Sequence, residues 1–102
     1  MTPEAKFEAI VAAFQKKEQV APGKMMSSPA LQYKGKVFAF FYQDKMCFKL
    51  GKSFQPEDSG INEWQHLSPF KNKPPMTAWF VIDPVHSDQW ENLSQMALEA
   101  MQ

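Results

Sequence analysis

A run of six residues, Val37 to Tyr42, constrains the fold more than any other part of the chain. No apolar run in the sequence is longer. A strand built from it presents apolar side chains on both faces, which is typical of a central strand. The run is far shorter than the roughly 20 apolar residues that a membrane-spanning helix needs. We therefore expect a buried sheet here and no association with a membrane.

Two turns flank this run and predict a β-meander over residues 30–50. The first turn, Lys34-Gly35-Lys36, contains a glycine that can adopt a positive φ. The second turn is Gln43-Asp44-Lys45, after which apolar and polar residues alternate as far as Leu50.

The register of the second hairpin stays open. A two-residue turn at Asp44-Lys45 pairs Phe41 with Phe48, whereas a three-residue turn pairs Phe40 with Phe48. A slip of one residue exchanges the aromatic side chains that face the core.

Amphipathic helices are predicted at both ends. Thr2 can cap the first, Pro3 suits its first position, and Glu4 suits the positive end of its dipole. Apolar residues at helical spacing extend this helix over about residues 3–18: Phe7, Ile10, Val11 and Phe14. The last helix is expected to begin near Ser87, with an apolar stripe of Trp90, Leu93, Ala97, Leu98 and Met101.

The remaining segments carry weaker patterns. Residues 20–29 are expected to form a loop, because the Pro22-Gly23 pair interrupts regular structure. Residues 51–75 are rich in Pro and Gly, although an apolar residue at every third position predicts a short helix around 58–67. A further strand is expected over 77–82.

Together these elements predict an α+β fold in one domain, residues 1–102. The order is helix, three strands, short helix, two strands, helix. Strands joined by tight turns are antiparallel, and helices with one apolar face pack on one side of the sheet. The expected architecture is a two-layer sandwich with an antiparallel sheet of about five strands.

The charge composition bears on the class of ligand. Eleven acidic residues balance eleven lysines, and the chain has no arginine. Arginine is the usual residue for bidentate contacts with phosphate and guanine. Lysines do gather around the predicted meander, but they also suit exposed sheet edges. Weak nucleic-acid binding is therefore only the third functional hypothesis.

Cys47 is the single cysteine, which excludes an intrachain disulfide. The N-terminus lacks the pattern of a signal peptide, and we expect a cytoplasmic protein. The Cys47 thiol is interpreted as a small residue on a sheet face. Alternatively, Lys45 or Lys49 lowers its pKa, and Lys49 is the closer candidate because it shares the same face.

No catalytic or metal-binding motif stands out. Ser27 and Ser28 lack a nucleophile-elbow pattern, and only His66 and His86 could serve as a histidine base. Glu63 and His66 have a spacing that can share a metal on a helix, but the further ligands are missing. We expect no enzymatic activity, no metal and no cofactor.

Several short motifs resemble the TfoX N-terminal domain family: Gly23-Lys24-Met25-Met26, Ala30-Leu31, Gly35-Lys36-Val37-Phe38-Ala39, Pro75-Met76-Thr77-Ala78-Trp79, and Trp90 with Leu93 and Ala97. The resemblance covers about residues 5–100. It implies a compact α+β domain with a five-stranded antiparallel sheet, related to YjbR-like proteins and type III secretion chaperones. The namesake of the family is a bacterial regulator of natural competence, and the family implies no catalytic residues.

Five apolar residues in or beside the irregular segments form the candidate interaction surface: Met25, Met26, Phe54, Trp64 and Phe70. The leading hypothesis is a non-enzymatic, regulatory protein-interaction module that binds a protein partner or forms a homodimer. The alternative is a small-molecule-binding protein or minor enzyme with a pocket near Met25, Trp64 and Phe70.

Overall fold

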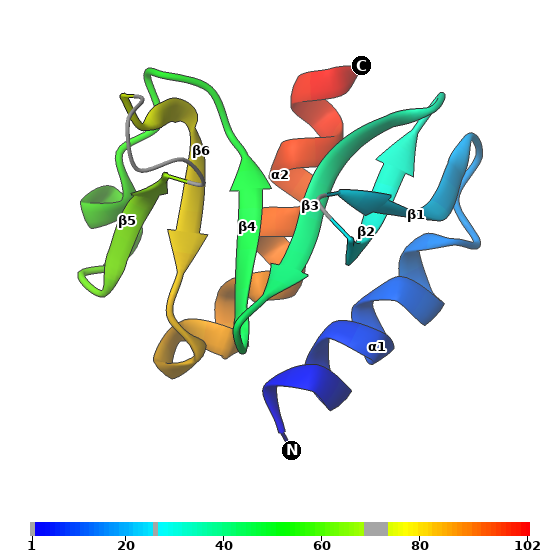
Figure 1. Ribbon diagram of the computed structural model, residues 1–102, viewed down its shortest axis with the longest axis horizontal. Coiled ribbons are helices and arrows are strands. Elements are labelled where there is room, and N and C mark those ends of the chain that lie inside the picture. Colours follow the sequence, from blue (N-terminus) through cyan, green and yellow to red (C-terminus); the bar gives the residue numbers. More distant parts are fainter. Residues whose placement is uncertain (1, 26, 69–73) are drawn as a thin grey trace.

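The computed structural model describes residues 2–25, 27–68 and 74–102. These residues form one six-stranded antiparallel sheet with two α-helices packed on it (Figure 1). The predicted α+β sandwich is confirmed, with six strands where about five were expected.

The elements are α1 (Pro3–Phe14), β1 (Val20–Met25), β2 (Ser28–Tyr33), β3 (Lys36–Tyr42), β4 (Lys45–Lys49), the 3₁₀ helix η1 (Pro56–Ser59), β5 (Trp64–Leu67), β6 (Met76–Ile82), the 3₁₀ helix η2 (Pro84–Gln89) and α2 (Trp90–Met101). The strand order is β1-β2-β3-β4-β6-β5, so β6 lies between two strands that precede it in the chain.

The first helix begins as predicted and ends earlier. The Thr2 side chain accepts a hydrogen bond from the Ala5 backbone N–H at 3.1 Å. The helix ends at Phe14 and not near residue 18. After it the chain turns, with a hydrogen bond from the Lys17 N–H to the Phe14 carbonyl at 2.9 Å and a φ of 68° at Gln19, and Val20 is buried at the start of β1.

The expected loop over 20–29 is wrong, because residues 20–25 form β1 and residues 28–33 form β2. β1 pairs only with β2, so it is an edge strand with one side unpaired. An edge strand tolerates proline, since the missing N–H can lie on the unpaired side. Pro22 therefore sits within a strand, although its sequence context is typical of a turn.

β3 is the buried central strand that the apolar run predicts. A β-bulge in it changes which of its side chains face the helices. The pairing with β2 shifts between Leu31 and Gln32, which leaves Phe38 as the extra residue. Phe38 and Ala39 both belong to the core beneath the helices, whereas Phe40 belongs to the opposite face.

Both expected registers of the second hairpin are wrong. Tyr42 pairs with Lys45, so the two turn residues are Gln43 and Asp44. Phe48 consequently lies opposite Ala39 rather than opposite Phe40 or Phe41. Gln43 and Asp44 have φ values of 50° and 64°. Two consecutive positive φ values suit the twist of a two-residue hairpin.

This turn yields a prediction about stability. Glycine adopts a positive φ without the steric cost that a Cβ imposes, so Asp44→Gly is expected to stabilise the protein by about 0.5–1 kcal/mol. Asp44→Ala is the control and is expected to destabilise it, because alanine lacks the polar side chain that helps aspartate adopt this conformation. Urea denaturation of both variants would measure the difference. Equal stability of the two variants would contradict the prediction.

The short helix expected around 58–67 is also wrong. The end of η1, which is capped by Gly60 with a φ of 76°, falls in this segment, and the edge strand β5 follows. Ile61 and Leu67 are both buried but lie in different cores, so their spacing does not describe one helix face. The strand expected over 77–82 is confirmed as β6.

The C-terminal helix follows a short 3₁₀ helix. Asp83 caps η2 by accepting a hydrogen bond from the Val85 N–H at 3.0 Å. The regular helix α2 therefore begins at Trp90, three residues after the expected start at Ser87.

Apolar side chains gather on both faces of the sheet. On the helix face, Phe7 of α1 stacks on Phe41 at 5.3 Å between ring centroids, and Trp90 of α2 meets Phe41 at 6.4 Å. We call the smaller set of buried residues on the other face the opposite-face cluster; it consists of Ala30, Phe40, Cys47, Leu67, Trp79 and Val81.

Candidate ligand-binding site

The structure does not bring the predicted surface residues together. Met25 lies on β1 and packs against the opposite-face cluster. Trp64 lies on β5, at the other edge of the sheet, and packs against the helix-face core, as does Phe54. Met26 and Phe70 lie outside the described residues. Met25 and Trp64 therefore do not line one pocket.

Phe54 and Trp64 cover the end of the core at Phe80. Each ring lies 5.2 Å from the Phe80 ring, centroid to centroid. The Trp64 indole also donates a hydrogen bond to Glu57 Oε2 at 2.8 Å. Both side chains are half-buried, which leaves little of their surface for a partner. Across residues 2–25, 27–68 and 74–102, the large hydrophobic side chains that are exposed are those of Tyr42, Met76 and Val85.

A cavity lies between the β3–β4 hairpin and β5. Its volume is about 440 Å³, within the range of small-molecule sites. Leu67 and Val81 link it to the opposite-face cluster. Its described lining consists of Tyr42, Gln43, Lys45, Gln65, His66, Leu67, Ser68 and Val81. The cavity thus combines a small apolar wall with several polar groups from three strands.

Contacts with neighbouring residues orient two of the polar groups. The Gln43 side-chain amide donates a hydrogen bond to the Tyr42 hydroxyl oxygen at 3.2 Å. His66 Nδ1 lies 3.3 Å from the carbonyl oxygen of Trp79. A carbonyl oxygen only accepts, so Nδ1 is the donor in this contact. The His66 ring packs against Trp64 and Phe80, at 5.1 and 4.9 Å between centroids, so it belongs to the helix-face core although the residue borders the cavity.

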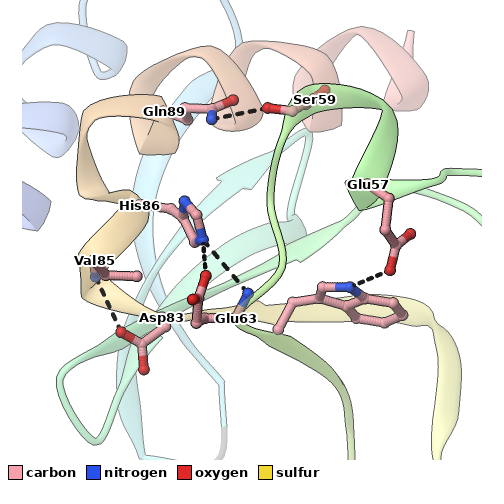
Figure 2. A network of polar contacts seen from close by, with 8 residues as sticks. Glu57, Ser59, Glu63, Asp83, Val85, His86 and Gln89 are labelled. Atoms are coloured by element: carbon pink, nitrogen blue, oxygen red, sulfur yellow. Dashed lines mark hydrogen bonds and ion pairs between the residues drawn. The ribbon is translucent and has the colours of Figure 1, made fainter.

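Lys45 is the only permanently charged side chain in the described lining. It is half-buried and forms no ion pair with the described acids. It also borders a smaller hollow of about 180 Å³ that Glu63 and Asp83 line. The two carboxylates have other partners, as Figure 2 shows: Glu63 pairs with His86 at 2.5 Å, and Asp83 caps η2.

The Cys47 thiol lies in the opposite-face cluster and is fully buried. Burial raises its pKa from 9.0 to about 12, and the nearby positive charge of Lys45 only partly offsets this effect. The sequence interpretation favoured Lys49 as the neighbour that lowers this pKa, but Lys45 has that role. The thiol is therefore held in its neutral form and is not a nucleophile in the folded protein.

A groove of about 460 Å³ between α1 and α2 is a weaker candidate. Lys17 on one side faces Asp88 and Glu91 on the other, so the groove selects neither sign of charge. The Lys17 ammonium already lies over the Phe14 ring, 5.2 Å from its centroid.

The residues considered for catalysis or metal binding are separated. Glu63 pairs with His86, not with His66, and Ser27 lies in the β1–β2 turn with a φ of 67°. Within the described part of the chain, no three histidine, cysteine, aspartate or glutamate residues are placed to hold one metal ion. The Glu63–His86 contact spans 23 residues of sequence, and neither residue carries a local signal for it.

Sequence reasoning missed Tyr42, Gln65 and Ser68 as lining residues of the cavity. The one available signal is the position of Tyr42, which places a hydroxyl at the end of an otherwise apolar run. The cavity itself depends on the pairing of β6 with both β4 and β5.

No family model, curated protein or solved structure matches this chain. The resemblance to the TfoX N-terminal domain family therefore stays a prediction. Among the described helices, none is both long enough and apolar enough to cross a membrane.

Proposed function

We propose that this protein is a small-molecule-binding domain whose ligand occupies the cavity between the β3–β4 hairpin and β5. The observation that carries the proposal is the convergence of polar groups from Tyr42, Lys45 and Gln65 on a cavity of about 440 Å³. Binding sites for small molecules combine a concave apolar wall with a few oriented polar groups. Leu67 and Val81 supply that wall here.

The leading hypothesis from the sequence, a protein-interaction module, is supported less well by this geometry. Phe54 and Trp64 are the aromatic residues of the candidate interaction surface that the structure describes. Both of their rings pack on Phe80. The exposed Tyr42 side chain lines the cavity instead of joining them. A regulatory role is compatible with ligand binding, since ligand occupancy can change the stability of the domain.

A thermal-shift screen with a metabolite library tests the proposal. A ligand present at one hundred times its Kd stabilises the folded state by about 2.7 kcal/mol, which raises Tm measurably. Backbone amide shifts in a ¹H–¹⁵N correlation spectrum then locate the ligand. We expect shifts that concentrate at residues 42–45 and 65–68. Shifts confined to the groove between α1 and α2 would contradict the proposal.

Filling the cavity gives a matched pair of variants. Gln65 is an exposed lining residue on an edge strand, so Gln65→Trp places a large ring in the cavity without disturbing a buried position. We expect it to weaken binding of the library hits at least about tenfold, because the ring and the ligand compete for the same volume. Thr77→Trp is the control: it lies on β6, is exposed and is not a lining residue. If the library hits bind the two variants equally tightly, their binding site lies outside this cavity.

A further inference from the structure

We propose that the cavity selects small organic carboxylates, with the Lys45 ammonium and the Tyr42 hydroxyl as the donors to the carboxylate. This inference rests on the proposed function and adds the chemical class of the ligand. It follows from the charge in the lining, from the direction of the hydrogen bonds and from the position of the nearby acids.

The first step concerns charge. Lys45 contributes one positive charge to the lining, and the described lining contains no carboxylate. An ammonium group that is partly removed from water is stabilised by a counter-ion. Glu63 and Asp83 line the adjacent hollow, but Glu63 already pairs with His86 and Asp83 with the Val85 N–H. A bound anion would supply the partner that the described residues do not.

The second step concerns donors. The Tyr42 oxygen accepts a hydrogen bond from Gln43, so its own O–H remains available to donate. Ser68 adds a second hydroxyl and Gln65 an amide N–H to the same lining. A site that offers mainly donors around one cation is complementary to an oxyanion.

The third step concerns the number of charges on the ligand. Phosphate sites commonly use arginine forks or several cations, and the chain has no arginine. Within the lining that the structure describes, one ammonium and one phenol match the single charge and two oxygens of a carboxylate.

The test compares charged ligands with neutral ligands of the same shape. The probes are benzoate, phenylacetate, cinnamate and hexanoate, each beside its carboxamide, with phenyl phosphate as the dianion. Binding to the full chain is followed by amide shifts at residues 42–45 and 65–68. We expect carboxylates to bind at least about tenfold more tightly than their carboxamides, because a charge-assisted hydrogen bond is lost with the charge.

Substitutions then assign the selectivity to Lys45. Lys45→Gln removes the charge and is expected to abolish the preference for carboxylates, whereas Lys45→Arg retains it. Lys49→Gln is the matched control, because Lys49 lies on the same strand, is exposed and is absent from the lining. Retained selectivity in folded Lys45→Gln protein would overturn the inference, and so would tighter binding of phenyl phosphate than of benzoate.

The two proposals fail in different ways. If carboxamides bind in the cavity as tightly as carboxylates, the carboxylate inference is overturned and the proposed function stands. If neutral library compounds bind in the cavity and no carboxylate does, the carboxylate inference is likewise overturned and the proposed function stands. If no library compound shifts the cavity amides, both proposals are overturned.

Discussion

Replacement of Phe80 by alanine is expected to lower the free energy of unfolding by about 3–5 kcal/mol. Phe80 is 1% exposed, and its ring contacts Phe54, Trp64 and His66 at centroid distances of 4.9–5.2 Å. Alanine leaves a void that these three rings, anchored on different segments, cannot close together. A domain of this size has a total stability of only about 5–15 kcal/mol, so the loss is a large share of it.

Urea denaturation measures this loss, and Phe54→Ala provides the control. Phe54 is half-buried and meets Phe80 by a single edge contact, so its truncation is expected to cost less than half as much. Phe80→Leu keeps most of the apolar volume and should fold well enough for ligand titrations. A loss below about 1 kcal/mol for Phe80→Ala would contradict the role assigned to this ring.

The stability of the protein is expected to fall steeply in alkaline solution because of Cys47. Burial raises the pKa of the folded thiol to about 12, whereas the thiol of the unfolded chain titrates near 9.0. Above pH 9 the unfolded state loses its proton while the folded state retains it. The stabilisation is therefore complete below about pH 9 and is lost as the pH rises toward 12. By about pH 10.5 the loss reaches roughly 2 kcal/mol.

Cys47→Ala isolates this effect, since it removes the thiol and leaves the other ionisable side chains in place. Stability curves of the two proteins between pH 8 and 10.5 should diverge as the pH rises. A thiol reagent at pH 8 provides a second readout. The thiolate fraction is about a thousandfold smaller in the folded state than in the unfolded state, so labelling should follow unfolding. Rapid labelling of the folded protein, or parallel stability curves, would contradict the assignment.

The elements that sequence reasoning predicted correctly carry their signal within a few neighbouring residues. The run from Val37 to Tyr42 is apolar on both strand faces, and Thr2-Pro3-Glu4 has the capping chemistry of a helix start. The missed strands lack such signals. Pro22-Gly23 is typical of a turn, and only pairing with β2 makes a strand of this segment.

The cavity could not be predicted for a related reason. Tyr42 and Lys45 line the same cavity as Gln65 because β6 pairs with both β4 and β5, an arrangement that no local pattern specifies. The bulge between His66 and Leu67 also shifts the alternation of β5. The sequence interpretation placed the candidate pocket near Met25, Trp64 and Phe70, yet Trp64 covers the core at Phe80.

The insertion of β6 between β4 and β5 has a consequence for the kinetics of folding. Strands β1 to β4 pair in sequence order through short turns, so their contacts are local and cost little chain entropy to form. β6 must instead find Met46 and Cys47 across a long stretch of intervening chain. Non-local pairing of this kind slows folding. The meander is thus expected to be organised in the transition state before β6 docks, so the cavity, whose wall includes Val81 of β6, would be completed last.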